Sequence, residues 1–430
     1  MSTVLGVVVI ARNGDRQQFH QDPETYAPSR TDSTALGVVD LHLLGSQLRA
    51  AYLTPGSSSF ISDISGTLAD TQQLKVLAKA GGEGAVVFDS AIALLQGLFP
   101  PNPRNKLTLA NETVVSAPLG GYQYVPLETV EPGNDRSMES WTDCPTFQKH
   151  VASFYKSEAF KSKAKEAEPF FHAVQDYVFG RPTTLENIWN IYDFMNTQLT
   201  YNQTYAYRLP PTLIDQARAL ADFHEDGVFS DAQANGIGNI AGRTVLGTIL
   251  KSLERIAFND DPLQLMVVQT SYQPFISLFH QTDIAKEYPE LKAIPNFGAA
   301  LAIELRRGNP PDARDFLRFK FRNGTADPEG WRLVHPFGHR ADIPLTEFIY
   351  RAEGAAVTTN KQWAQVCGVQ AHDDVSIFTF ARRSSLQIGV AMIFLALFLF
   401  ATALIRARRA RARAYHQYMN IPEFEVRLSG

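Results

Sequence analysis

Cysteine is rare in this chain, because Cys144 and Cys367 are the only two among 430 residues. Two cysteines exclude a disulfide-rich scaffold and a zinc site made of four thiolates. The sequence also lacks an HExxH motif, and a proline and a glycine between His335 and His339 keep these two rings off a common helix face. We therefore predict no metal and no other cofactor. The two cysteines could pair in an oxidising compartment or remain as two buried thiols.

An excess of basic charge is absent from most of the chain. The formal net charge is −4, and residues 406–430 contain six arginines and two glutamates, which is +4, so the first 405 residues carry −8. An acidic body repels the phosphate backbone of nucleic acids. Low-complexity tracts and internal repeats are also missing, and 45% hydrophobic residues is typical of globular proteins. We therefore predict a folded chain with no nucleic acid partner.

Charged residues are missing altogether from residues 386–405, LQIGVAMIFLALFLFATALI. Twenty apolar residues can span a bilayer as a helix. The arginine-rich stretch RARRARAR follows directly, and basic residues on one flank place that flank in the cytosol. We predict a single-pass membrane protein with a transmembrane helix at 386–405, a basic cytosolic tail at 406–430 and a lumenal or extracellular body. The alternative is a buried core helix, which rarely lacks any polar face.

Three N-glycosylation sequons agree with a lumenal body, and they begin at Asn111, Asn202 and Asn323. The first residues lack the basic segment and the small-residue cleavage site of a signal peptide. We expect either that further residues precede Met1 in the cell, or that the protein is inserted by its tail and faces the cytosol. The arginines after residue 405 favour the first alternative.

Two apolar runs rich in β-branched residues, 4–11 and 263–270, are typical of strands buried on both faces of a parallel sheet. Helical spacing of apolar residues predicts helices at 36–53, 86–99 and 240–256. Alternation predicts exposed edge strands at 316–321 and 331–337. Strands that alternate with helices indicate an α/β fold, so we predict a mainly parallel sheet flanked by helices.

The composition shifts to helix formers between about residues 144 and 229, where β-branched runs are few. This shift predicts an all-helical cap at 144–229 that is inserted into the α/β core. The core would then consist of residues 1–143 and 230–380.

The stretch ARNGDR, residues 11–16, stands where the first predicted strand passes into a loop. Ligands of open α/β sheets usually bind at this edge. Arg12 and Arg16 flank Gly14, guanidinium groups bind phosphate through paired hydrogen bonds, and a glycine lets the backbone approach an anion closely. The pattern predicts a phosphate site, and the alternative is a turn with two solvated arginines.

This stretch resembles the Arg-His-Gly-x-Arg signature of the histidine acid phosphatases, branch two of the histidine phosphatase superfamily. SAIALLQGLFPP, residues 90–101, resembles the family's second helix, and DCPTFQKHV from Asp143 resembles the start of its helical cap. KQWAQVC, residues 361–367, resembles the place where the cap cysteine finds its partner. The resemblance covers most of residues 4–370 and implies the phosphoglycerate mutase-like fold and a disulfide between Cys144 and Cys367.

The resemblance also implies where the groups of the catalytic pocket would lie, and three of these groups are changed. The family's nucleophilic His corresponds to Asn13, whose amide nitrogen has a delocalised lone pair and cannot attack phosphorus. A His-Asp pair that holds phosphate and protonates the leaving oxygen corresponds to Gln269 and Thr270, and neither delivers a proton as a carboxylic acid does. The family's third phosphate-binding Arg has no equivalent, because residues 50–103 contain no arginine.

Arg12 and Arg16 are the pocket residues retained by identity. We therefore predict a pseudophosphatase that binds a phosphorylated small molecule or protein through them. The alternative is an active acid phosphatase that hydrolyses phosphomonoesters with a non-standard nucleophile. His20 is the nearest candidate for that role, and His372-Asp373 imitates the family's His-Asp pair. We disfavour both, because catalysis loses heavily from small displacements and no apolar strand leads into His372.

Overall fold

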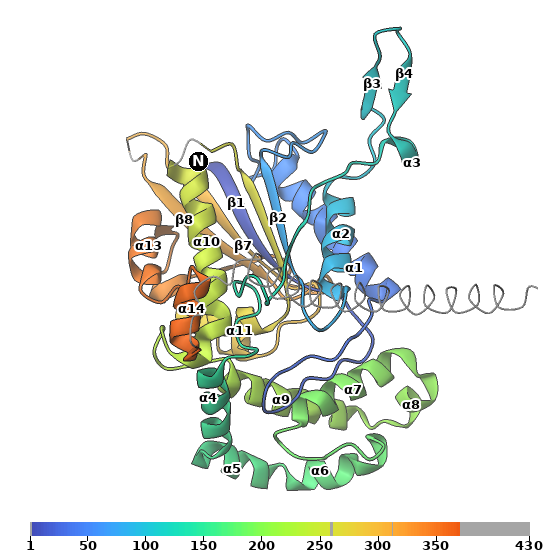
Figure 1. The fold of residues 1–430 in the computed structure, drawn as a ribbon, viewed down its shortest axis with the longest axis vertical. Coiled ribbons are helices and arrows are strands. Elements are labelled where there is room, and N and C mark those ends of the chain that lie inside the picture. The colour runs from blue at the N-terminus through green and yellow to red at the C-terminus, as the bar shows by residue number, and fades with distance from the viewer. Residues whose placement is uncertain (1, 259–260, 312, 370–430) are drawn as a thin grey trace, which may run out of the picture. The chain divides into compact units, whose positions relative to one another are not determined.

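A central eight-stranded sheet organises the protein, with the strand order β10-β8-β7-β1-β6-β2-β5 and β9 paired to β8 (Figure 1). The structure is a computed structural model that describes residues 2–258, 261–311 and 313–369. The strands of the sheet are β1 (Thr3–Arg12), β2 (Leu74–Lys79), β5 (Glu128–Val130), β6 (Leu265–Thr270), β7 (Ala300–Arg307), β8 (Asp315–Arg322), β9 (Arg332–Val334) and β10 (Ile343–Pro344). A separate two-stranded ribbon, β3 (Lys106–Thr108) with β4 (Val114–Ser116), projects away from the sheet (Figure 1).

Helices lie on both faces of the sheet and beyond its carboxyl edge (Figure 1). The helices are α1 (Ala35–Leu48), α2 (Val86–Leu98), α3 (Pro118–Gly121), α4 (Pro145–Tyr155), α5 (Glu158–Glu166), α6 (Glu168–Val174), α7 (Ile188–Tyr201), α8 (Gln203–Arg208), α9 (Pro211–Val228), α10 (Ile240–Phe258), α11 (Gln273–Gln281), α12 (Ile284–Glu287), α13 (Leu345–Glu353) and α14 (Asn360–Cys367). Short helical turns are η1 (Arg49–Leu53), η2 (Gln175–Tyr177), η3 (Ile237–Asn239), η4 (Pro289–Lys292) and η5 (Pro336–Gly338).

Strand β1 lies at the centre of the sheet and is buried on both faces, as its unbroken apolar run predicts. Val8 and Ile10 belong to a core cluster that includes residues of α10 and α13. Val7, Val9 and Ala11 point the other way, into a cluster with residues of α1 and α2. The alternation of side chains along a strand produces this division. The predicted strands at 4–11 and 263–270 are therefore confirmed as β1 and β6.

The prediction of a mainly parallel sheet is wrong, because the sheet is mixed. Strand β6 runs parallel to β1 and β2, and β2 runs parallel to β5. Strands β7, β8, β9 and β10 instead form antiparallel pairs. Only seven residues separate the end of β7 at Arg307 from the start of β8 at Asp315, and such a short connection can join only antiparallel neighbours.

The prediction that residues 316–321 form an exposed edge strand is also wrong. Strand β8 pairs with β7 on one side and with β9 and β10 on the other. Leu317, Phe319 and Phe321 are buried, whereas the residues between them are only partly buried. The alternation in this strand therefore reflects unequal cover of its two faces and not a position at the edge.

Helices α4 to α9, called the cap helices below, lie together beyond the carboxyl ends of β1 and β2 (Figure 1). They share a core cluster in which Phe147, Ile191 and Phe229 are fully buried. The loop at 17–34 between β1 and α1 reaches onto this cluster. Phe19 packs edge-on against Trp189 of α7, with ring centroids 5.6 Å apart.

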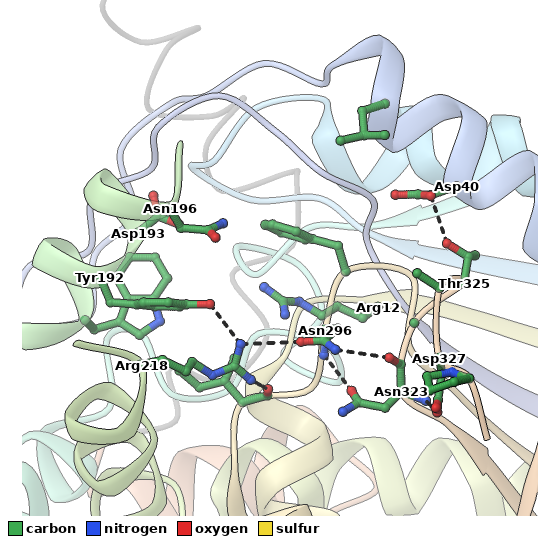
Figure 2. Close-up of a pocket in the computed structure, with 17 residues that line it drawn as sticks. Arg12, Asp40, Tyr192, Asp193, Asn196, Arg218, Asn296, Asn323, Thr325 and Asp327 are labelled. Atoms are coloured by element: carbon green, nitrogen blue, oxygen red, sulfur yellow. Dashed lines mark hydrogen bonds between the residues drawn. The ribbon is translucent and has the colours of Figure 1, made fainter. Parts of the chain in front are cut away.

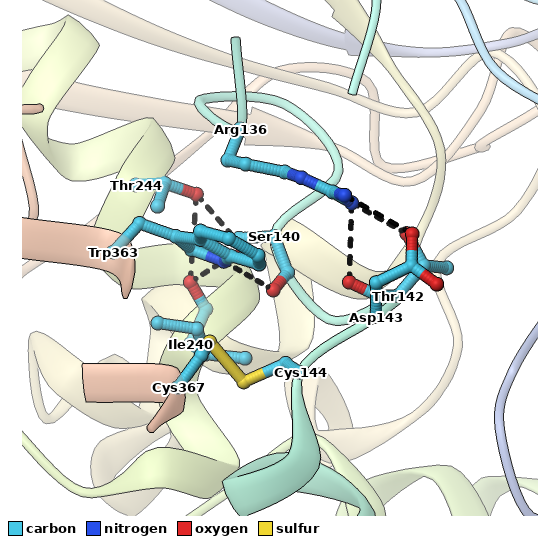
Figure 3. The surroundings of a disulfide bond; sticks show 9 residues. All are labelled: Arg136, Ser140, Thr142, Asp143, Cys144, Ile240, Thr244, Trp363 and Cys367. Carbon is cyan, nitrogen blue, oxygen red and sulfur yellow. Dashed lines mark hydrogen bonds and ion pairs between the residues drawn. A yellow bond between two sulfur atoms is a disulfide. The ribbon is translucent and has the colours of Figure 1, made fainter. Parts of the chain in front are cut away.

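The disulfide between Cys144 and Cys367 is confirmed and joins the start of α4 to the end of α14 (Figure 3). Both residues are fully buried. Next to the disulfide, the indole N–H of Trp363 donates to the carbonyl of Ser140 at 2.8 Å, and the guanidinium of Arg136 lies 4.5 Å from the Trp363 ring centroid (Figure 3). The disulfide thus ties the start of the cap helices to the last described helix.

The predicted transmembrane helix at 386–405, the tail at 406–430 and His372-Asp373 lie outside the described residues. Within residues 2–258, 261–311 and 313–369, no helix is both long and apolar enough to cross a membrane.

Candidate functional site

A cavity of about 600 Å³ lies between the carboxyl edge of the sheet and the cap helices (Figure 2). Arg12, at the end of β1, lines it from the sheet side, and Tyr192 of α7 and Arg218 of α9 line it from the cap side. The turn at 323–328, which follows β8, closes a third side. Several chain segments that are distant in sequence therefore meet at the position where α/β folds bind ligands.

Arg12 carries a positive charge that no described carboxylate neutralises. Its side chain is 6% exposed, and it lies over the ring of Phe297, with the guanidinium carbon 4.2 Å from the centroid. One Nη donates to the carbonyl of Pro295, while Nε is buried and has no hydrogen-bond partner within the described residues. Burial, together with the charges of Arg16 and Arg218, lowers the pKa of Arg12 to about 9. An anion in the cavity would reverse this effect, because it would stabilise the charged guanidinium.

Arg16 meets its anion within the protein. Its two Nη atoms bind both carboxylate oxygens of Asp193 on α7, at 2.8 and 3.1 Å, and these side chains are 6% and 8% exposed. The same carboxylate accepts the backbone N–H of Phe19 at 2.8 Å. A paired, two-bond contact of this kind is the strong form of arginine recognition. Arg16 therefore anchors α7 to the loop after β1, and its fork is already occupied.

Asn13, the residue after Arg12, is fixed in place by three hydrogen bonds. Its backbone N–H donates to Thr270 at 2.9 Å, and its carbonyl accepts from the N–H of Gly298 at 3.1 Å. Its side-chain nitrogen donates to the carbonyl of Gly14 at 2.8 Å. Gly14 itself lies so close to α1 that an added Cβ would be 2.4 Å from the carbonyl oxygen of Gly37. The glycine in ARNGDR is thus required by backbone packing.

Gln269 and Thr270 lie beside this segment, since Ala11 and Arg12 of β1 pair with them in register. Both are fully buried, and the side-chain oxygen and nitrogen of Gln269 and the hydroxyl of Thr270 have no hydrogen-bond partner in the described part of the chain. The structure therefore brings Arg12, Asn13, Gln269 and Thr270 together at one edge of the sheet. Neither Gln269 nor Thr270 lines the 600 Å³ cavity.

A second cavity, of about 20 Å³, adjoins Asn13 and is also lined by Arg12, Arg16 and Glu83. This volume holds about one water molecule. One carboxylate oxygen of Glu83 accepts from Lys79 at 2.5 Å, and the other is buried without a hydrogen-bond partner among the described residues. Lys79 also pairs with Glu139 at 2.6 Å. Although burial lowers the pKa of Lys79, these two carboxylates raise it above its usual value.

The charge around Asn13 is therefore unlike that of a phosphate-transfer site. Glu83 lines the small cavity next to Asn13 and shares Lys79 with Glu139, while Asp193 neutralises Arg16. A carboxylate in contact with the small cavity repels a phosphate dianion. Arg12 lines both cavities, and the larger one is the better anion site because a volume of about 20 Å³ has no room for a phosphate group.

His20 does not lie at either of these cavities. It is exposed on the loop after β1 and lines a separate cavity of about 510 Å³ with Tyr155 and Arg181. His335 hydrogen-bonds to the hydroxyl of Tyr288, and His339 to the carboxylate of Glu347, each at 3.0 Å. Across the described residues, no three His, Cys, Asp or Glu side chains are grouped so that they could hold a metal ion.

The three sequon asparagines differ in exposure. Asn111 lies in the turn between β3 and β4 and is exposed. Asn202 is exposed and caps α8 by accepting the N–H of Tyr205. Asn323 is half-buried, lines the 600 Å³ cavity and accepts the N–H of Asn296 at 2.7 Å. Asn111 and Asn202 are therefore the more accessible acceptors.

The sequence analysis missed four residues of this region: Asp40, Glu83, Asp193 and Arg218. Asp193 and Arg218 lie in amphipathic helices of the cap, where single charged residues are ordinary solvent-facing choices. Glu83 lies in a glycine-rich loop with no distinctive pattern. No local signal marks any of them, because only the packing of cap and sheet brings them to the site.

No protein-family model matches the sequence. The chain is 25% identical to the lysosomal acid phosphatase of Pongo abelii over 326 residues, and this alignment covers 74% of the chain and 69% of that protein. It is also 25% identical to the lysosomal acid phosphatase of Homo sapiens over 286 residues, and this alignment covers 65% of the chain and 61% of that protein.

Solved structures of two phytases are similar in fold. The Klebsiella sp. ASR1 phytase matches with a TM-score of 0.56 and 12% identity, over 84% of this chain and 98% of that chain. The phytase from Citrobacter braakii matches with a TM-score of 0.55 and 11% identity, over 84% of this chain and 99% of that chain. The likeness shows a shared α/β fold with a central sheet flanked by helices. Together with the sequence similarity to acid phosphatases, it supports the resemblance to the histidine acid phosphatases.

Proposed function

We propose that this chain is a membrane-anchored relative of the histidine acid phosphatases that binds a phosphorylated ligand and does not hydrolyse it. The observation that carries the proposal is the buried guanidinium of Arg12, which has no described carboxylate partner and lines a cavity of about 600 Å³. A buried unpaired charge is costly, and a phosphate bound in the cavity would compensate it.

Arg218 and Tyr192 support the same interpretation from the cap side. An Nη of Arg218 donates to the hydroxyl of Tyr192 at 2.8 Å, and its Nε lies 3.0 Å from the carboxylate of Asp222. Figure 2 shows Arg218 and Tyr192 on one side of Arg12. Arg218 is neutralised by Asp222, so its contribution to phosphate binding would be that of a hydrogen-bond donor. Arg12 would supply the uncompensated charge.

We propose that the chain does not hydrolyse its ligand, because the groups beside Arg12 lack the required chemistry. Asn13 cannot attack phosphorus, and neither Gln269 nor Thr270 can protonate a leaving oxygen at acid pH. Glu83, at the small cavity next to Asn13, adds a negative charge where a phosphoryl group would have to sit. Three independent features therefore oppose turnover.

We also propose the organisation of the chain in the cell. Residues 386–405 would anchor it, residues 406–430 would face the cytosol, and the core (1–143 and 230–380) and the cap (144–229) would be lumenal. The lysosomal acid phosphatases that the chain resembles are named for a lumenal compartment. A glycosidase treatment should shift the mobility of the full chain on a gel, and Asn111→Gln with Asn202→Gln should remove most of that shift. Unchanged mobility of the wild type would contradict lumenal placement.

The proposed function is tested with two measurements on the full chain in mild detergent. Release of phosphate from an aryl phosphate between pH 3 and 7 should not exceed background. Inorganic phosphate at about 100 times its Kd should stabilise the fold by about 2.7 kcal/mol, read as a rise in Tm. Clear turnover that Arg12→Gln abolishes would instead establish the alternative, an acid phosphatase with a non-standard nucleophile, which the similarity to acid phosphatases favours.

Arg243 offers a matched control for Arg12. It is also buried, its Nε donates to the carbonyl of Ala355 at 2.9 Å, and burial lowers its pKa. It does not line the 600 Å³ cavity. Arg12→Gln should abolish the phosphate-induced rise in Tm, whereas Arg243→Gln should lower the Tm and leave that rise intact. Equal loss in both variants would show that Arg12 is not the phosphate ligand.

A further inference from the structure

The wall of the 600 Å³ cavity opposite Tyr192 and Arg218 is acidic. Figure 2 shows Asp40, Thr325 and Asp327 together on that side of Arg12. One carboxylate oxygen of Asp40 accepts from the hydroxyl of Thr325 at 2.8 Å. Within the described residues, no Lys, Arg or His lies within ion-pair distance of Asp40 or Asp327.

Asp40 is half-buried on α1, and its negative charge is uncompensated. Burial and the nearby carboxylate of Asp15 raise the pKa of Asp40, although the hydrogen bond from Thr325 opposes this. Asp15 is itself buried and accepts from the hydroxyl of Thr34 at 2.6 Å and from that of Tyr201. A cation placed against Asp40 would therefore be attracted by two carboxylates.

The cavity thus has an uncompensated positive charge at Arg12 and an uncompensated negative charge at Asp40. Asp193 pairs with Arg16 and Arg218 pairs with Asp222, whereas Asp327 accepts two backbone N–H groups and has no cationic partner among the described residues, so it adds to the negative charge of the wall at Asp40. The lining of the cavity also includes aromatic side chains, among them Trp189. Aromatic faces also attract ammonium groups. A polyanion would face repulsion at Asp40, whereas a molecule with both charges would satisfy both ends of the cavity.

We propose that the ligand of this cavity is a zwitterionic phosphomonoester, with its phosphate on Arg12 and an ammonium group on Asp40. The proposal rests on the proposed function, because it takes Arg12 as the phosphate ligand. It adds the chemical class of the rest of the molecule and assigns Asp40 as the residue that selects it.

The test compares two probes of nearly equal size, O-phosphoethanolamine and propyl phosphate, which differ in that an ammonium group replaces a methyl group. Their Kd values are measured at pH 7 and low salt by calorimetry on the full chain. O-phosphoethanolamine should bind about fivefold more tightly than propyl phosphate, since fivefold corresponds to about 1 kcal/mol, the upper range for a solvent-accessible ion pair. Asp40→Asn should remove this preference, and Arg12→Gln should weaken both probes.

The outcomes separate the two proposals. Equal Kd values for both probes in the wild type would overturn the zwitterion proposal and leave phosphate binding at Arg12 standing. A preference that persists in Asp40→Asn would overturn the assignment of Asp40. Failure of both probes and of inorganic phosphate to bind would overturn the proposed function and this inference with it. The wild-type comparison needs no variant, so a folding defect in Asp40→Asn cannot mask the result.

Discussion

Removal of the disulfide should weaken the fold by an amount that follows from the length of the loop it closes. Cys144 and Cys367 are 223 residues apart. In the chain-entropy model a closed loop of this length stabilises the folded state by about 5 kcal/mol at 25 °C. The entropy of unfolding is about 2.1 cal/mol/K per residue, so the folded unit that ends at Val369 should lose about 6 °C in Tm.

The assay is urea unfolding of the full chain, with the Cys144→Ala/Cys367→Ala variant compared to the wild type. Alanine fits both buried positions without adding a polar group. Wild type unfolded in the presence of a reductant serves as the control, and its midpoint should match that of the variant. A loss below about 2 kcal/mol would refute the reasoning, because the cross-link would then restrict the unfolded chain much less than its loop length requires.

Three further predictions concern the sheet, the packing of α1 and the missing nucleophile. Glu304 is buried, and its carboxylate lies 2.7 Å from the ammonium group of Lys320. Burial raises the pKa of Glu304, but its cationic neighbours outweigh this effect and lower the pKa below its usual value. The contribution of Glu304 to stability is therefore present near neutral pH and is lost as the pH falls through its folded-state pKa. Glu304→Gln should flatten the acid limb of a plot of unfolding free energy against pH, and a parallel shift of the plot would contradict this. Gly45→Ala should lower the free energy of unfolding in urea by about 1–3 kcal/mol, because the new Cβ would lie 2.0 Å from a carbonyl oxygen of α2. The control is Gly133→Ala, whose Cβ would meet no atom within 4 Å, and this variant should change stability little. Asn13→His should release no phosphate from an aryl phosphate, since a carboxylate lines the adjoining cavity, and turnover above the wild-type background would contradict that account.

Much of the sheet could be predicted from the sequence because burial on both faces gives a distinctive pattern. The run at β1 is apolar without interruption, since α1 and α2 cover one face and α10 covers the other. The direction of the strands could not be predicted in the same way. Alternation in β8 is equally compatible with parallel and antiparallel neighbours, and with an inner or an outer position. The direction of β8 relative to β7 follows only from the short length of the connection between them.

The candidate site also contains residues that the sequence indicates and residues that it does not. Arg12 and Asn13 could be found because they follow a strand in consecutive positions of one motif. Asp193 lies 177 residues after Arg16 and reaches it only because α7 packs on the loop after β1. A single charged residue on an amphipathic helix carries no sign of its partner. The sequence therefore indicates the cationic half of the site and is silent about the anionic half.

The central place of β1 in the sheet has a consequence for synthesis. Val8 pairs with Met266 on one side and with Ile303 on the other, so neither neighbour of the first strand exists until most of the chain has been made. At about 5–20 residues per second, the strand waits roughly 15–60 s for both partners. During this interval an apolar segment without hydrogen-bonding neighbours is exposed to other chains. Residues 4–11 would therefore be available throughout this interval to a chaperone that binds extended apolar segments.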